Sequence, residues 1–188
     1  MTTAPRLHRY TYDEYLSALR DSQIKLEFWG GEIFAMAGGT REHGALASKT
    51  MALIDAQLAA GCRTFSPDVR VRVEANDVTF FPDGSVVCGK PEAPKGDRES
   101  ITNPVLIVEV TSPSTEDYDR TAKLEQYQQL ASLQAVWLVS HREPRVTVVE
   151  RTSGGWKTTE RRTGERLTLE APKLSIDIDA IYRVLDGL

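Results

Sequence analysis

The 188-residue chain has the composition of a folded, water-soluble domain: 40% of its residues are hydrophobic, 27% are charged, and the mean hydropathy is −0.34. These values exclude a disordered or collagen-like chain, and no apolar run approaches the ~20 residues that a transmembrane helix needs. The net charge of −4 argues against a protein that coats nucleic acid with a broad basic face, but it allows an enzyme that contacts a few phosphates in a cleft.

The chain carries no sign of export. Its N-terminus lacks the apolar segment of a secretory signal, so we expect a cytoplasmic protein with no membrane partner. The two cysteines, Cys62 and Cys88, form no disulfide framework, and in a reducing compartment we expect both to be free thiols. The length predicts one domain, residues 1–188.

The N-terminal third predicts a helix, a hairpin and a second helix. A capping-box pattern, Thr-x-x-Glu, opens a helix over about 11–20. Two apolar runs, 26–29 and 32–36, flank a Gly-Gly pair and predict a β-hairpin. Apolar residues then recur at helical spacing over 42–60, with Gly61 as the expected C-cap.

The middle of the chain predicts strands. Residues 68–74 alternate valine with charged residues, which predicts a strand with one polar face. Residues 78–88 predict a second strand, interrupted at 82–84, and 89–103 predict a long exposed loop because they are rich in proline, glycine and charge. The almost continuous apolar run 105–110 predicts a central strand buried on both faces.

The last third predicts a helix over about 115–130, opened by a variant capping box, Ser-x-x-Asp, at 114–117. The remaining predicted elements are a strand, a hairpin and a short amphipathic C-terminal helix, over 135–139, 145–151 with 156–161, and 177–185.

Together these elements predict an α/β (α+β) domain. After the N-terminal hairpin the order is helix, strand, strand, strand, helix, strand, followed by the C-terminal hairpin. Helices and strands mixed in this way make a layered domain, in which a central mixed sheet is flanked by helices.

Glu109 is the most informative residue because it lies inside the apolar run 105–110. A carboxylate there must be paired, neutralised or bound to a cation, since burying it bare costs several kcal/mol. The plain alternative is a structural glutamate that an arginine or backbone amides satisfy.

Asp83 lies at the predicted strand interruption, where a bend can aim a side chain at a site. The alternative is an ordinary turn aspartate before glycine. If the strands that carry Asp83 and Glu109 pair side by side, two carboxylates converge, as a hard cation such as Mg²⁺ requires.

Lys123 shares one helix face with Asp119 and Tyr127, at a spacing of four residues. Either it forms an i, i+4 salt bridge on a solvated face, or it reaches over the sheet to orient a water molecule or to stabilise developing negative charge.

Three further residues are secondary candidates. His43, near a helix start, could be a general base, although a lone histidine more often packs or caps. Asp68 and Arg70 lie on the polar strand face, where Asp68 could hold a metal and Arg70 a phosphate if that face meets the site. Otherwise both belong to cross-strand ion pairs on a solvated face.

Four stretches together resemble the Uma2 family of restriction-endonuclease-like proteins, which have the PD-(D/E)XK nuclease fold. They are FFPDGSVV at 80–87, LIVEVTSPST at 106–115, DRTAKLEQY at 119–127 and AVWLV at 135–139. The resemblance also includes LEFWGGEI at 26–33 and His43, and it covers residues 8 to about 150.

The resemblance implies that Asp83 and Glu109 are the two acids of the nuclease motif. Thr111 stands where a lysine is expected two residues after the second acid, and the family pattern takes its lysine from the following helix, at Lys123. Glu27 resembles the additional acid that many such nucleases place near the metal.

The expected function is therefore a Mg²⁺-dependent endonuclease, with Mn²⁺ as a substitute, that acts as a homodimer on nucleic acid, DNA above all. Asp83, Glu109 and the carbonyl of Val110 would ligate the cation, Lys123 would orient the attacking water, and Tyr127 would hold Lys123 or a phosphate.

A different class of function stays open at this point: a non-catalytic module that binds nucleic acid or protein and retains the nuclease fold. The acidic net charge and Thr111 favour this module. The intact acid pair and the available Lys123 oppose it.

Overall fold

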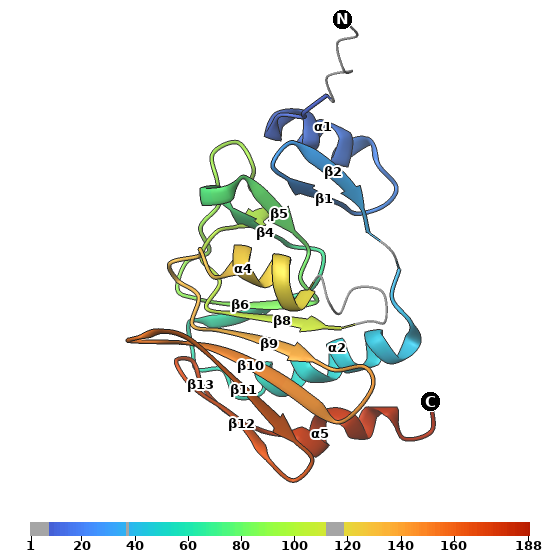
Figure 1. Cartoon of the computed structure of the whole chain (residues 1–188), viewed down its shortest axis with the longest axis vertical. Helices are drawn as coiled ribbons and strands as arrows, with labels where there is room; N and C mark the ends of the chain where they lie inside the picture. The colour runs from blue at the N-terminus through green and yellow to red at the C-terminus, as the bar shows by residue number, and fades with distance from the viewer. Residues whose placement is uncertain (1–7, 37, 112–118) are drawn as a thin grey trace, which may run out of the picture.

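A computed structural model of the chain describes residues 8–36, 38–111 and 119–188. Its strands form two main sheets and a separate two-stranded ribbon, with helices packed against them (Figure 1). The sheets are mixed, because β4 pairs with β7 and β8 with β9 in parallel while the other pairs are antiparallel. The predicted α/β (α+β) class, with mixed sheets flanked by helices, is confirmed.

The first sheet has the order β2-β1-β5-β4-β7. Its strands are Leu26–Trp29 (β1), Glu32–Ala35 (β2), Arg70–Val73 (β4), Val78–Phe80 (β5) and Ser100–Ile101 (β7). The second sheet has the order β11-β10-β9-β8-β6-β3. Its strands are Cys62–Phe65 (β3), Gly84–Cys88 (β6), Leu106–Val110 (β8), Ala135–Val139 (β9), Arg145–Thr152 (β10) and Gly155–Arg162 (β11). The ribbon consists of Arg166–Glu170 (β12) and Lys173–Asp177 (β13).

The helices are short, and α2 is the longest of those described. They are Tyr12–Asp21 (α1), Arg41–Asp55 (α2), Leu124–Tyr127 (α4) and Ile178–Tyr182 (α5). The described residues also form single turns: the 3₁₀ turns Glu74–Asn76 (η1) and Arg183–Leu185 (η3), and the π turn Asp119–Lys123 (η2), which leads directly into α4. None of the described helices combines the length and apolar character needed to cross a membrane.

Three apolar clusters hold these layers together. The largest lies between the second sheet and α2, α5 and the β12–β13 ribbon. A second cluster joins the other face of this sheet to the first sheet, with Tyr127 of α4 buried between them. A third packs α1 onto β1 through Tyr15, Leu16 and Phe28. The two sheets therefore share this second cluster, and α4 lies where they meet (Figure 1).

Several local predictions are confirmed. The capping box of α1 is present, with Thr11 and Glu14 each bonding the other's backbone. The β1–β2 hairpin turns at Gly30-Gly31, whose φ angles of +52° and +93° suit glycine. The central strand (β8), the following strand (β9), the β10–β11 hairpin and the short C-terminal helix also form as predicted.

The predicted strand over 78–88 is really two strands in different sheets. β5 belongs to the first sheet and β6 to the second, and residues 81–83 carry the chain across. The predicted interruption at Asp83 is thus the place where the chain passes from the first sheet to the second.

Other local predictions are wrong. The second helix ends at Asp55, and Ala56 rather than Gly61 is its C-cap. Gln57 leaves the helix because its side-chain amide exchanges two hydrogen bonds, of 3.0 and 2.8 Å, with the backbone of Ser175 in β13. The loop 89–103 is not wholly exposed, since β7 pairs with β4 within it and Asp97 is buried.

The predicted helix over 115–130 is shorter where it is described: α4 ends at Tyr127 and begins with a π turn. Its predicted cap at 114–117 lies outside the described residues. The strands β12 and β13 were not predicted from the sequence, although alternating apolar residues there bury one face of the ribbon.

The expectation of two free thiols is wrong in this structure, which joins Cys62 and Cys88 in a disulfide. The reason is register: β3 and β6 are antiparallel, and these two cysteines lie directly opposite each other, with Cα atoms 3.9 Å apart. A pairing between strands 26 residues apart leaves no trace in the spacing of the cysteines.

Candidate active site

The two predicted acids meet where the chain crosses between the sheets. β6 and β8 are antiparallel neighbours with Gly84 opposite Val108, so the next pair along the ladder brings Asp83 opposite Glu109. The Val110 N–H donates to Asp83 Oδ2 at 2.7 Å, and the Asp83 N–H donates to Glu109 Oε2 at 3.4 Å. Each carboxylate is thus oriented by the backbone of the strand that carries the other.

Lys123 links this acid pair to the first sheet. Its Nζ lies 2.9 Å from Glu109 Oε1 and 3.2 Å from Glu27 Oε1, and its side chain is buried. Lys123 therefore points toward the acids, as predicted, and its side chain is buried rather than solvated. The π turn η2 carries the lysine to this position, between the two sheets.

Two further candidates complete the cluster. Glu27 comes from β1 and accepts a hydrogen bond of 3.1 Å from the Phe81 N–H, on the crossing segment. The Tyr127 hydroxyl donates to Glu109 Oε1 at 2.7 Å. Glu109 is buried, with 4% of its surface exposed, and so it is held by a cation, a phenol and an amide.

His43 also reaches the cluster, from the first turn of α2. Its Nε2 lies 3.1 Å from Asp83 Oδ2. Its backbone N–H donates to the Thr40 side-chain hydroxyl, which caps the helix. The hydrogen bond to Asp83 raises the pKa of His43 above its ordinary value, against the opposite effect of burial. Gly39 is needed beside the ring, because a Cβ there would lie 2.7 Å from His43 Nδ1.

The cluster opens into a groove of about 1530 Å³. Glu27, His43, Asp83, Glu109 and Lys123 all line it. The β1–β2 hairpin forms another part of its lining, with apolar residues that the analysis of the sequence did not single out: Trp29, Phe34 and Met36. Their alternation along a short hairpin resembles that of ordinary core residues, so only the structure shows that they face a groove.

The donor set suits a hard cation that keeps part of its water shell. Within the described residues, no group of three or more histidine, cysteine, aspartate or glutamate side chains could hold a metal. Mg²⁺ is usually held by one or two carboxylates together with water and substrate oxygens, whereas a structural zinc site needs four protein ligands. In the Asp83–Glu109 pair one oxygen of each carboxylate accepts from a backbone N–H, and the pair fits the first case.

Comparison with known proteins shows the family of this chain. The family model Uma2, described as "Putative restriction endonuclease", matches residues 12–179. This chain belongs to the Uma2 family. The resemblance predicted from the four sequence stretches is confirmed, over a longer part of the chain than those stretches cover.

Two relatives from Synechocystis sp. extend over most of this Uma2 protein, and both are described as uncharacterized. The first, slr1290, is 32% identical over 175 residues, which are 92% of this chain and 91% of the relative. The second, sll1609, is 29% identical over 130 residues, which are 69% of this chain and 73% of the relative.

A solved structure shares the fold. It is a crystal structure described as a putative nuclease belonging to DUF820 from Anabaena variabilis, and it matches with a TM-score of 0.75 at 20% identity. The match covers 94% of this chain and 99% of that one. The two chains therefore share their fold over almost their whole length.

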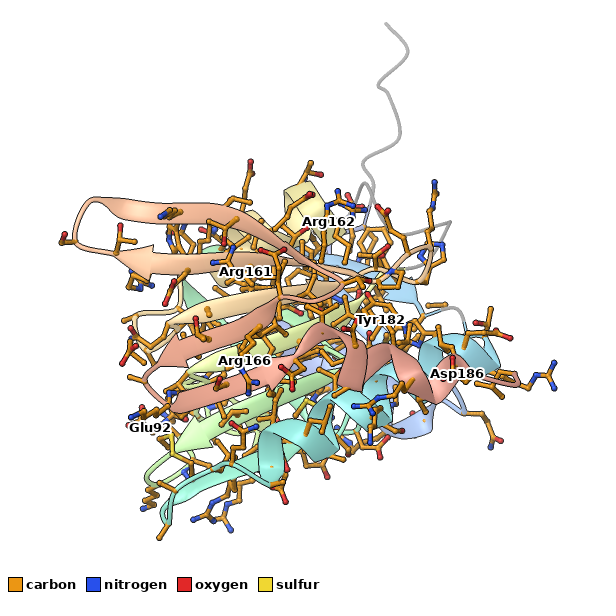
Figure 2. The ribbon with its side chains drawn as sticks, turned by 90° about the horizontal axis from the view of Figure 1, so that it is seen from below. Glu92, Arg161, Arg162, Arg166, Tyr182 and Asp186 are labelled. Carbon is orange, nitrogen blue, oxygen red and sulfur yellow. A yellow bond between two sulfur atoms is a disulfide. The ribbon has the colours of Figure 1, made fainter. Side chains whose placement is uncertain are left out.

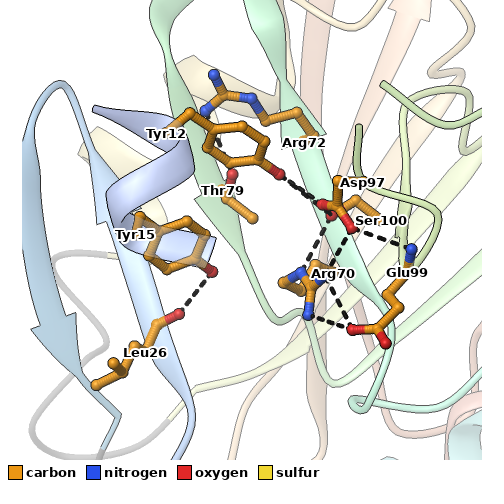
Figure 3. A network of polar contacts seen from close by, with 9 residues as sticks. All are labelled: Tyr12, Tyr15, Leu26, Arg70, Arg72, Thr79, Asp97, Glu99 and Ser100. Carbon is orange, nitrogen blue, oxygen red and sulfur yellow. Dashed lines mark hydrogen bonds and ion pairs between the residues drawn. The ribbon is translucent and has the colours of Figure 1, made fainter. Parts of the chain in front are cut away.

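In the Uma2 protein, Arg70 is not among the described residues that line the groove, so the structure favours the ion-pair alternative over the phosphate ligand. Its guanidinium lies 2.7 Å from Asp97 and 3.2 Å from Glu99, and its Nε donates to Ser100 (Figure 3). Tyr12 of α1 donates to Asp97 at 2.6 Å. We call Tyr12, Arg70, Asp97, Glu99 and Ser100 the α1 network. The polar side chains Arg70 and Arg72 of β4 are buried, so this face is not solvated.

Asp68 also lies apart from the acid cluster. Its side chain is largely exposed and forms an ion pair of 2.8 Å with Lys25. The hydrogen bond from Lys25 lowers the pKa of Asp68 below its ordinary value. The structure therefore favours the surface ion pair over the metal ligand for this residue.

A group of arginines on the strands β11 and β12 offers no obvious phosphate site. Figure 2 shows Arg161, Arg162 and Arg166 on this side of the molecule. Arg162 pairs with Glu160 at 2.9 Å, and Arg166 pairs with Asp177 at 2.6 Å. Acids thus neutralise Arg162 and Arg166, while Arg161 donates to the Glu160 backbone carbonyl, so the groove remains the best candidate site of the Uma2 protein.

Proposed function

We propose that this protein is a metal-dependent nuclease that hydrolyses phosphodiester bonds, with Mg²⁺ as its cation and DNA as its substrate. The single observation that carries the proposal is the contact of Lys123 with Glu109 beside Asp83, at the floor of an open groove. An acid pair next to a lysine supplies the charges that phosphodiester hydrolysis needs. Membership of a family described as restriction endonucleases supports the same function.

The acid pair would hold the cation. Asp83 and Glu109, with the carbonyl of Val110, would be its protein ligands, and the bound cation would lower the pKa of a water molecule and offset charge on the phosphate. The chain itself prepares the ligands: the Val110 and Asp83 N–H groups orient the two carboxylates, and Tyr127 orients Glu109. His43 holds Asp83 from the other side.

Lys123 would act on the reacting phosphate. Its ammonium can orient the attacking water or stabilise the negative charge that develops in the transition state. Glu27 keeps this lysine at the site when Glu109 binds a cation, because Lys123 contacts both acids. In this proposal Lys123, from η2, would take the role of the lysine that is absent at Thr111.

A cleavage assay tests the proposal. Plasmid DNA, single-stranded DNA and RNA are incubated with the protein in Mg²⁺, in Mn²⁺ and in a chelator. We expect cleavage only with a divalent cation, and a loss of about 100-fold or more in Glu109→Gln. Glu125→Gln is the matched control, since Glu125 is an exposed acid on α4 close to Lys123.

Calorimetric titration with Mn²⁺ separates this function from the alternative, a binding module that retains the fold. A stoichiometric site that is lost in Asp83→Ala supports the nuclease. Absence of cleavage on every substrate, together with absence of a cation site, would overturn the proposal in favour of the module. A homodimer is required only if both strands of a duplex are cut at one place, and light scattering measures it directly.

A further inference from the structure

The β1–β2 hairpin has two faces of different chemistry. Cross-strand partners lie on the same face of a hairpin. The pair Phe28–Ile33 packs against α1, and so this face belongs to the core. On the opposite face Glu27 pairs with Phe34, next to Trp29, and all three line the groove.

Phe34 is an exposed ring immediately beside the acid cluster. Because it is directly opposite Glu27, its Cβ lies about 5 Å from that of an acid that contacts Lys123. Four large hydrophobic residues are exposed among the described residues, and two of them, Phe34 at 48% and Ile24 at 55%, line this groove. An exposed ring costs hydration free energy unless a ligand covers it.

The groove has few cations for a duplex. Three lysines or arginines are among its described lining residues, and each already has a partner. Arg9 donates to the Gly30 carbonyl, Lys25 pairs with Asp68, and Lys123 pairs with the acids. Double-stranded DNA carries one negative charge per ~1.7 Å of its axis and is held mainly by neutralising phosphates. The described lining is poorly suited to that task.

We propose that the groove takes a single strand of nucleic acid, with an unstacked base on Phe34 and the adjacent phosphate at the acid pair. This inference rests on the proposed function, because it places the scissile phosphate at Asp83 and Glu109. Base stacking on aromatic rings tolerates any sequence and needs no second strand. Ile24 and Trp29 line the same groove and add to its apolar surface.

Fluorescence anisotropy in a chelator tests this without turnover. The probes are a labelled 12-nucleotide DNA strand, the RNA of the same sequence and the DNA duplex. We expect the DNA strand, the RNA strand or both to bind, and to bind about tenfold more tightly than the duplex. Phe34→Ala should weaken single-strand binding about tenfold, Phe34→Tyr should retain it, and Phe34→Leu should fall between them. Leu188→Ser, which removes another exposed apolar side chain, should change nothing.

The outcomes separate this inference from the nuclease itself. Equal or tighter binding of the duplex, or unchanged binding in Phe34→Ala, overturns the inference while cleavage of plasmid DNA upholds the nuclease. Single-strand binding that depends on Phe34 without any cleavage upholds the inference and overturns the nuclease. If Phe34→Ala alters the oligomeric state and leaves nucleic acid binding unchanged, the hairpin face is a contact between copies and the inference is wrong.

Discussion

Two buried clusters of charge in this protein have nearly the same composition and opposite surroundings. In the α1 network, Arg70 lies 2.7 and 3.2 Å from two carboxylates; in the groove, Lys123 lies 2.9 and 3.2 Å from two carboxylates. Asp97 accepts further hydrogen bonds from Tyr12 and Ser100 beneath α1, and neither it nor Arg70 lines the groove. A buried ion pair alone therefore does not indicate an active site. A buried ion pair that lines a groove is the better candidate.

The cations themselves fit this difference. The planar guanidinium of Arg70 bonds Asp97, Glu99 and Ser100 at once, which suits a fixed structural contact. The compact ammonium of Lys123 can exchange one acid for another or for a phosphate oxygen without losing its geometry. We expect the first cluster to control stability and the second to control catalysis.

The largest expected effect is on folding, in Arg70→Met. Removing this cation leaves Asp97 buried without its counter-charge, and we expect a loss of about 3–5 kcal/mol in the free energy of unfolding. Urea unfolding measures it, with Arg166→Met as control, because Arg166 forms an exposed pair worth at most about 1 kcal/mol. Folded Arg70→Met should cleave normally; a loss of turnover instead would remove the distinction between the clusters.

The next effect is on turnover, in Lys123→Ala. We expect kcat to fall about 100-fold or more, which corresponds to about 2.7 kcal/mol of transition-state stabilisation. Lys123→Arg should recover little of it, since a planar fork does not replace the ammonium. Circular dichroism and Mn²⁺ titration check that fold and cation site remain. Full activity in Lys123→Ala would reduce this cluster to a structural ion pair like that of Arg70.

Low pH should reduce the stability that the α1 network contributes. Burial alone would raise the pKa of Asp97, but hydrogen bonds from Ser100 and Tyr12 and the charge of Arg70 outweigh it and hold that pKa below its ordinary value. The unfolded state therefore binds the proton first as the pH falls, and the stabilisation is complete above the unfolded pKa of about 3.9 and lost below it.

Urea midpoints between pH 7 and pH 3 measure this loss. We expect the wild type to lose stability more steeply below about pH 4 than Asp97→Asn, whose side chain does not titrate. Parallel curves for the two proteins would show that Asp97 is not the residue through which acid acts.

The smallest effect should come from Asp68→Asn. Its partner Lys25 lies on the surface, where an ion pair contributes less than about 1 kcal/mol. Mn²⁺ affinity and cleavage should both match the wild type. A weaker cation site in this variant would restore Asp68 as a ligand and would contradict the separation seen in the structure.

The elements that could be predicted share one property: their signal is local. The capping box at Thr11, the Gly-Gly hairpin and the apolar strand around Glu109 each lie within a few consecutive residues. Side-chain periodicity and turn chemistry act over that range, so the sequence states them directly. Glu109 could be found for the same reason, as an acid within an apolar run.

What the tertiary structure decided depends on segments that are distant in sequence. The polar face of β4 is buried because α1 and the segment around Asp97 cover it, and Cys62 faces Cys88 because of strand register. Local patterns contain neither fact, since an arginine in an alternating strand has the same spacing whether water or a helix covers it.

The site combines both kinds of information. Asp83, Glu109 and Lys123 could be named from the sequence, because buried acids and the family pattern single them out. Their meeting point, the contact of Lys123 with Glu27, and the exposed ring of Phe34 beside it required the crossing between two sheets. The sequence by itself thus determined which residue types could carry out the chemistry. The groove that gives a substrate access to them exists only where the sheets converge, because strand pairing rather than sequence proximity brings its walls together.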